Sequence, residues 1–291
     1  MAINALQSGL VIAAFGKRYD IELANGRQIG CVTRGKKSDL ACGDRVEIKL
    51  TSGNEGVIEN TIPRSSLLYR SNAFRSKLLA ANVTQIIIVL AAVPSFYEDL
   101  LNRCLIAAEA AGIRALILLN KSDLPETATA LQRLQLYLSL GYAVQPLSAK
   151  QDALPLRHWL QGQASVLVGK SGMGKSTLVN ALLPEVNSRT QEISAVLDSG
   201  KHTTTSARLY HLDADSHLID SPGLQEFGLS HLSTDQMEHA FIEFRPYLGK
   251  CRFNNCRHLK EPGCAILGAV ADGKISAIRL QCYQKLLAEL S

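Results

Sequence analysis

The stretch from Gly169 to Thr177 constrains the fold more than any other part of the chain. It reads Gly-Lys-Ser-Gly-Met-Gly-Lys-Ser-Thr, which fits Gly-x4-Gly-Lys-[Ser/Thr], and it directly follows the apolar run 165–168. The run predicts a short buried strand, and the leucines of 176–183 predict a helix with a packed face. In that context backbone N–H groups converge on phosphate oxygens, and the helix N-terminus adds partial positive charge. We therefore predict a phosphate-binding loop, rather than a chance glycine-rich turn, in an α/β domain.

Residue types within this loop indicate separate roles. Lys175 is expected to reach the β- and γ-phosphates and to take part in catalysis, and Ser176 is expected to bind Mg²⁺. The predicted nucleotide contacts of the loop are Gly169, Lys170, Ser171, Gly172, Met173, Gly174, Lys175, Ser176 and Thr177. Because kinases, ATPases and transporters all use such loops, the loop alone does not identify the base.

Two motifs upstream indicate guanine. Each follows an apolar run that predicts a strand, and together they comprise Asn120, Lys121, Ser122 and Asp123, then Ser148, Ala149 and Lys150. The carboxylate of Asp123 can accept hydrogen bonds from N1–H and the exocyclic amine of guanine, whereas adenine would leave it unpaired. The stem of Lys121 can cover the base, and 148–150 can contact it from the next strand. An ATP-using enzyme such as a kinase is the alternative.

Two further motifs lie downstream of the loop. A strand predicted at 216–220 ends in Asp220-Ser-Pro-Gly223, in which the carboxylate holds Mg²⁺ and the glycine amide contacts the γ-phosphate. The segment 200–205 offers threonine hydroxyls for the metal, with Thr204 as the candidate among three neighbours, and it resembles a switch segment.

The position after Asp-x-x-Gly is Leu224, where many GTPases have a glutamine that orients water. Leucine cannot hydrogen-bond water, so we expect slow intrinsic turnover or a group supplied from elsewhere. His202 is our candidate for orienting the water, and a packing or capping role within its segment is an equal alternative.

The five motifs occur in an unusual order, since the two base-recognition motifs precede the phosphate loop and the two switch motifs come last. This order indicates a circularly permuted GTPase domain, which we assign to residues 66–230. The buried run 85–91 and the alternation of strands with amphipathic helices predict a mostly parallel sheet with helices on both faces. Ligands are then expected at the carboxyl ends of the strands.

The N-terminal segment, residues 1–65, is expected to form an all-β barrel of the oligonucleotide-binding (OB) type. About five short alternating runs with turns such as Asn25-Gly26 indicate it. A barrel without a nucleic-acid role is equally compatible with the residues, because only Phe15 and Tyr19 offer aromatic faces. The basic residues Arg64, Arg70, Arg75 and Lys77 follow it, and we interpret them as a solvated linker.

The C-terminal segment, residues 231–291, carries a candidate metal site. Three of the seven cysteines cluster with a histidine as Cys251-x4-Cys256-x-His258-x5-Cys264, a set suited to a tetrahedral structural Zn²⁺. Amphipathic helices are predicted at 235–244 and 275–290, and Cys282 is expected in their core rather than at the metal. Because the cluster lies in a short loop-rich segment, we expect little core and a large contribution of the metal to folding.

Taken together, these motifs resemble the small ribosomal subunit biogenesis GTPase family, over nearly the whole chain. The resemblance implies an OB-fold RNA-binding barrel, a circularly permuted P-loop GTPase domain and an α-helical zinc-binding domain. It implies a GTPase that hydrolyses GTP to GDP and phosphate, binds the small ribosomal subunit and its rRNA, acts late in subunit maturation and is stimulated by the subunit. The family's zinc ligands match Cys251, Cys256, His258 and Cys264 one for one.

Composition is compatible with this resemblance but adds little. The net charge of +5 permits a polyanionic partner, and no apolar run approaches the ~20 residues of a membrane span. We expect a cytoplasmic monomer without membrane contact. A GTP-controlled RNA-binding module, in which hydrolysis is incidental, is the alternative from a different functional class.

Overall fold

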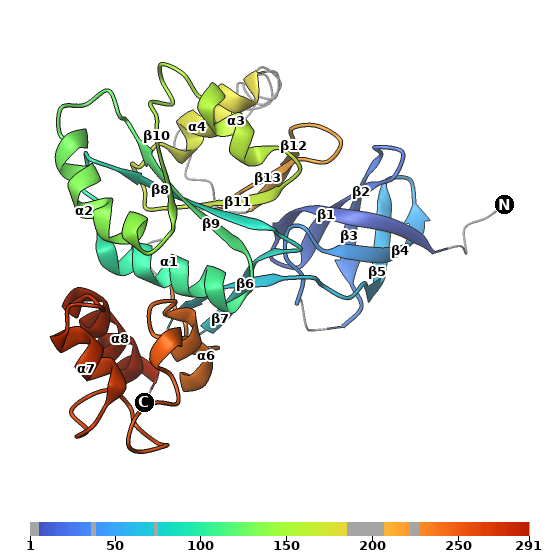
Figure 1. Cartoon of the computed structure of the whole chain (residues 1–291). Coiled ribbons are helices and arrows are strands. Elements are labelled where there is room, and N and C mark those ends of the chain that lie inside the picture. Colours follow the sequence, from blue (N-terminus) through green and yellow to red (C-terminus); the bar gives the residue numbers. More distant parts are fainter. Residues whose placement is uncertain (1–5, 36–38, 73–74, 185–206, 222–226, 291) are drawn as a thin grey trace.

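The structure is a computed structural model that describes residues 6–35, 39–72, 75–184, 207–221 and 227–290 (Figure 1). Among these residues, no helix has the length and apolar character needed to cross a membrane.

The N-terminal strands close into a barrel. Their bounds are β1 Gln7–Phe15, β2 Arg18–Leu23, β3 Gln28–Thr33, β4 Arg45–Ser52 and β5 Glu55–Thr61. Neighbours pair in the order β1-β2-β3-β5-β4, and β4 pairs back onto β1, so the sheet has no free edge here. Alternate residues such as Tyr19, Ile21 and Ile48 fill the interior. The predicted five-stranded, OB-like barrel is confirmed.

The central sheet of the second region is mostly parallel, as predicted. Its parallel strands are β8 Gln85–Ala91, β9 Arg114–Asn120, β10 Ala143–Pro146, β11 Ala164–Val168 and β13 His217–Asp220. They lie in the order β10-β9-β8-β11-β13. Every residue of β8 is buried, because it lies between two strands and under helices on both faces. Strand β12, Arg208–His211, was not predicted, and it adds to β13 antiparallel.

Helices cover both faces of this sheet (Figure 1). Helix α1, Glu98–Ala110, and helix α2, Thr127–Ser139, lie on one face. Helix α3, Leu154–Leu160, and helix α4, Lys175–Leu182, lie on the other. Sequence analysis did not predict α3, because seven residues are too few to give a clear helical period.

The joint between barrel and central sheet differs from the predicted solvated linker. Its backbone forms a hairpin of β6, Leu67–Asn72, and β7, Arg75–Ala81. Arg64 is not a solvated side chain either, since its Nε lies 2.6 Å from Oδ1 of Asp44, whose side chain is fully buried. A second connection pairs Ala13 of β1 with Arg208 of β12. The linker prediction is therefore wrong at this position, because the segment forms a local hairpin and Arg64 pairs with a buried carboxylate, neither of which a basic composition reveals.

The C-terminal region packs directly on the central one. It contains α6 Thr234–Ala240, a 3₁₀ turn η1 Arg245–Tyr247, α7 Ala265–Ala271 and α8 Ala277–Leu290. Phe241, Phe244 and Tyr283 belong to the same buried cluster as the central sheet. Arg279 is fully buried and contacts Glu243 of this region and Asn102 of α1. These helices extend the core of the neighbouring domain, whereas the cysteine loop 251–263 is mostly exposed, so the expectation of little core in that loop is confirmed. Cys282 packs against that core, as predicted.

Candidate functional site

The predicted phosphate loop joins β11 to α4. The loop starts at Gly169, directly after the strand, and α4 begins at Lys175. Gly174 has φ +93°, and a Cβ added there would lie 2.2 Å from Nδ2 of Asn120. Both the backbone conformation and the space require glycine at this position. The strand, loop and helix expected from the sequence are thus all present.

Asn120 connects three of the predicted motifs. It is 2% exposed at the end of β9. Its Nδ2 donates a hydrogen bond to the carbonyl oxygen of Met173 in the phosphate loop, at 3.0 Å. Its Oδ1 accepts from the backbone N–H of Ala149, also at 3.0 Å. A single amide therefore fixes the loops that follow β9, β10 and β11 relative to one another.

The neighbours of Asn120 are positioned by backbone contacts. Lys121 has φ +60°, and its Nζ donates to the carbonyl oxygen of Val93 at 2.7 Å. Asp123 is exposed, and a hydrogen bond from the Ser148 side chain lowers the pKa of its carboxyl group. Lys150, another predicted base-contacting residue, is also exposed. The carboxylate of Asp123 is thus ionised and accessible at the carboxyl edge of the sheet.

Lys175 and Asp220 form the charged centre of the site. Nζ of Lys175 donates to the carbonyl oxygens of Gly169, at 2.8 Å, and Lys170, at 3.4 Å. Burial raises the pKa of Asp220 to about 6, and the nearby Lys175 opposes this rise. Burial likewise lowers the pKa of Lys175, against the attraction of Asp220. Oδ1 of Asp220 is buried, with no hydrogen-bond partner among the described residues. A buried carboxylate oxygen without a donor suits a cation or its bound water.

Part of the predicted site lies outside the described residues, namely His202, Thr204, Gly223 and Leu224. Ser176 and Ser171 are described and exposed, next to the charged centre along the loop. One contact was not predicted: Nζ of Lys170 lies 4.3 Å from the ring centroid of Tyr97. No sequence signal links these two residues, because they come from separate strand-to-helix loops.

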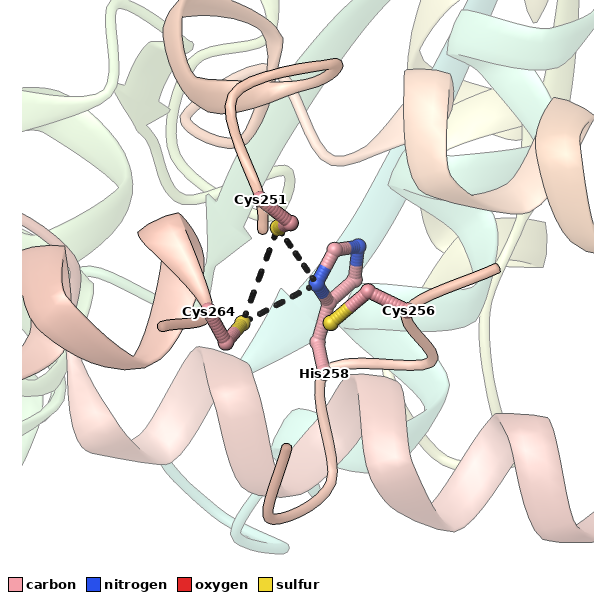
Figure 2. Close-up of side chains that lie close together, drawn as sticks. All are labelled: Cys251, Cys256, His258 and Cys264. Carbon is pink, nitrogen blue, oxygen red and sulfur yellow. Dashed lines mark hydrogen bonds between the residues drawn. The ribbon is translucent and has the colours of Figure 1, made fainter. Parts of the chain in front are cut away.

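The four predicted metal ligands converge on one point (Figure 2). One ligand atom from each of Cys251, Cys256, His258 and Cys264 lies within 4.8 Å of the others. Two thiolates at about 2.3 Å from a tetrahedral zinc would lie roughly 3.8 Å apart. The Sγ atoms of Cys251 and Cys264 are 3.8 Å apart, and Nδ1 of His258 lies 3.6 Å from the former and 3.2 Å from the latter. This donor set and its spacing fit a metal ion.

The surroundings of the cluster also suit thiolates. Backbone N–H groups donate to two of the sulfurs, from Ala265 to Cys251 at 3.3 Å and from Leu267 to Cys264 at 3.4 Å. On the far side of the imidazole ring, Nε2 of His258 lies 3.6 Å from Oε1 of Glu238, a residue of α6. Sequence analysis did not find Glu238, because it precedes the cysteine motif and no ligand spacing includes it.

Comparisons with known proteins agree with this architecture. The model of the RsgA GTPase family matches residues 61–230. A small ribosomal subunit biogenesis GTPase RsgA of Nitrosospira multiformis is 54% identical over 97% of this chain and 91% of its own length. The protein of that name from Nitrosomonas europaea is 52% identical, with the same coverage of 97% and 91%.

Two solved structures are similar over nearly the whole chain. YjeQ from Thermotoga maritima has a TM-score of 0.74 and 28% identity, covering 98% of this chain and 99% of its own. YloQ, described as a circularly permuted GTPase, has a TM-score of 0.71 and 27% identity, covering 99% and 96%.

Proposed function

This chain belongs to the RsgA GTPase family, and we propose that it hydrolyses GTP to GDP and phosphate while acting on the small ribosomal subunit late in its maturation. The relatives compared above are named small ribosomal subunit biogenesis GTPases, and the chain covers 91% of their length. The proposal adds the residues that bind the nucleotide and the ions.

The observation that carries the proposal is the position of Asn120. Its two hydrogen bonds join the phosphate loop at Met173 to the base-contacting loop at Ala149. These loops are far apart in the sequence and would bind opposite ends of one nucleotide. A buried amide that holds both in register supports a single guanine-nucleotide pocket at the carboxyl edge of the sheet.

Guanine recognition is assigned to Asp123, with Lys121 and Ser148–Lys150 around the base. The side-chain hydrogen bond from Ser148 lowers the pKa of the Asp123 carboxyl, and the ionised carboxylate can accept from two donors of guanine. Adenine would leave that carboxylate without a partner. The phosphates are assigned to the backbone N–H groups of 169–177, at the N-terminus of α4.

Magnesium is assigned to Ser176 and Asp220, with Thr204 as a further candidate ligand. The unpartnered Oδ1 of Asp220 supports this assignment, because a bound cation or its water would satisfy it. When bound with GTP, Mg²⁺ neutralises charge on the β- and γ-phosphate oxygens. Lys175 would leave its contacts with the Gly169 and Lys170 carbonyls and donate to the phosphates instead. Gly223 and the water-orienting role of His202 remain proposals from the sequence.

Zinc is assigned to Cys251, Cys256, His258 and Cys264 as a structural ion. Four protein ligands would close its coordination, leaving no position for substrate. Nε2 of His258 lies 3.6 Å from Oε1 of Glu238, which accepts a hydrogen bond from Tyr283, and a shorter contact with this carboxylate would direct Nδ1 toward the metal. The ion would thereby join the cysteine loop to α6, which packs on α1 of the GTPase domain.

The barrel and the zinc region are proposed to contact ribosomal RNA. Their affinity for the RNA would depend on whether GTP or GDP is bound. The β12–β13 pair supports this coupling, because it pairs with the barrel through β1 and ends at Asp220. We retain the sequence-based domain bounds 1–65, 66–230 and 231–291, and the expectation of a cytoplasmic monomer without membrane contact.

The test is a GTPase assay with and without purified small ribosomal subunits. The wild type should turn over slowly alone and faster by orders of magnitude with subunits. Lys175→Ala should lose the stimulated rate, and Asp123→Asn should shift preference from GTP toward xanthosine triphosphate. The control Arg157→Ala changes an exposed basic residue of α3, outside the barrel and the zinc region. Subunits that bind but leave the rate unchanged would favour an RNA-binding module in which hydrolysis is incidental.

A further inference from the structure

A second group of metal-ligating side chains lies between the barrel and the central sheet. His211 ends β12 and His217 begins β13, and the two are paired across this hairpin. Their Nδ1 atoms lie 3.1 Å apart, and their rings are nearly perpendicular at 86°. Two nitrogens each about 2.0–2.1 Å from one metal ion, at an angle of roughly 100°, would have this separation.

Glu22 of the barrel fixes the orientation of the pair. Its Oε1 lies 2.7 Å from Nε2 of His211. A carboxylate at this nitrogen holds the proton on Nε2 and leaves the lone pair of His211 on Nδ1, facing His217. A carboxylate–histidine–metal arrangement of this kind is the usual second shell of a histidine ligand. In Figure 1 the turn between β12 and β13 faces the barrel beside β2.

The charges and burial around His217 favour its neutral, ligating form. Burial lowers the pKa of His217, and the neighbouring His211 lowers it further. Asp213 in the hairpin turn acts in the opposite direction, and Arg45 of β4 adds positive charge. Glu22 and Asp213 would therefore attract a cation, and Arg45 would repel it. This balance predicts modest metal affinity, with water in the remaining coordination positions.

We propose that His211 and His217 bind one divalent first-row transition-metal ion through their Nδ1 atoms, with Glu22 as the positioning residue. The ion replaces the proton that one Nδ1 now donates to the other. His217 then carries its proton on Nε2, so each ring keeps one N–H and binds the ion through Nδ1. Imidazole ligands suit Zn²⁺, Ni²⁺ and Cu²⁺. Because Glu22 belongs to β2 and both histidines to the β12–β13 hairpin, a bound ion tightens the connection between the two domains.

The test is calorimetric titration of the zinc-loaded full chain with NiCl₂, with zinc content measured before and after. The wild type should bind one Ni²⁺ per chain while keeping its zinc. His211→Ala and His217→Ala should each abolish this binding, and Glu22→Gln should weaken it about 10- to 100-fold. His158→Ala changes an exposed histidine of α3 and should leave it unchanged. Wild-type binding that is absent at millimolar Ni²⁺, or that survives both histidine variants, overturns the proposal.

A second measurement avoids dependence on the folding of the variants. Adding further Zn²⁺ to the zinc-loaded wild type should shift the ¹⁵N resonances of Nδ1 in both His211 and His217. The Nδ1 resonance of His158 should not move. Unchanged resonances of His211 and His217 at saturating Zn²⁺ would also overturn the proposal.

Discussion

The cysteine–histidine cluster and the nucleotide site are built in opposite ways. The cluster takes its four ligands from one short loop, 251–264, and its members lie within 4.8 Å of one another. The nucleotide site takes its residues from strand ends between 120 and 220, which the buried central sheet holds in register. We infer that the loop depends on its ion for stability, whereas the nucleotide site depends on the sheet, so changes to its residues should affect function more than stability.

The largest expected effect is on the loop. Cys256→Ser should release zinc and destabilise the C-terminal region by several kcal/mol, since structural zinc contributes on the order of 10 kcal/mol in small zinc domains. Cys282→Ser is the matched control, because Cys282 packs against the core and should cost only about 1 kcal/mol. Thermal unfolding and zinc content measure both. Equal destabilisation by the two substitutions would contradict the dependence on the ion.

The next largest effect is expected for Gly174→Ala, which should reduce nucleotide affinity much more than stability. Gly174→Ala places a Cβ 2.2 Å from Nδ2 of Asn120 at φ +93°, so we expect guanine-nucleotide affinity to fall by about 100-fold or more. The unfolding midpoint should fall only slightly, because the strain is confined to the loop. Gly268→Ala in α7 meets open space and serves as the control. Titration with a fluorescent GDP analogue gives both affinities, and an unchanged value for Gly174→Ala would contradict the prediction.

A smaller effect, on zinc affinity, is expected for Glu238, which lies beside the cysteine–histidine cluster. Glu238→Ala removes the acceptor near Nε2 of His258, so zinc affinity should fall about 10- to 100-fold while GDP affinity is unchanged. Competition with a chelator measures the zinc affinity. Asp235→Ala, on the same helix but exposed, should not alter it. Zinc affinity that is the same in both variants would rule out an orienting role for Glu238.

The smallest effect is a gain in stability at the nucleotide site. The folded-state pKa of Asp220 is about 6, above its ordinary value of 3.8, so the native state binds more protons between these values. Its contribution therefore makes the unfolding free energy fall as pH rises from about 4 to about 6. Asp220→Asn should remove this dependence and raise the stability of the nucleotide-free protein at pH 7.5 by about 1–2 kcal/mol. It should also lose Mg²⁺-dependent hydrolysis.

Urea unfolding at several pH values checks the last prediction. The difference between Asp220→Asn and the wild type should shrink below pH 4 and reach its full size above pH 6. A variant less stable than the wild type at pH 7.5 would mean that the attraction of Lys175 outweighs the cost of burying Asp220.

Sequence analysis predicted most of the fold from local patterns. The buried run 85–91 and the alternating runs of the barrel correspond to strands, because burial on one or both faces leaves a period in the sequence. It missed α3 and α7, which are seven residues each, and the β6–β7 hairpin, whose composition is basic. Seven residues contain few helical repeats, and the basic composition of 64–77 indicated a solvated segment although its strands form a local hairpin.

The chemistry of both sites could be predicted from the sequence alone. The residue types and spacings of Gly169–Thr177, Asn120–Asp123 and Cys251–Cys264 predict a phosphate loop, a guanine-binding carboxylate and a metal cluster, and the order of the motifs predicts the permutation. These features are local, because neighbouring residues share one turn or one loop and their spacing fixes which groups can act together.

Only the tertiary structure decided how distant residues meet. Asn120 with Met173, Glu238 with His258 and Glu22 with His211 come from elements far apart in the sequence. The contacts of Asn120 and Glu22 depend on strand order and register, and the Glu22 contact also depends on β12 pairing with β1 of the barrel. The folding of the whole chain sets these distances, and no spacing along the sequence encodes them.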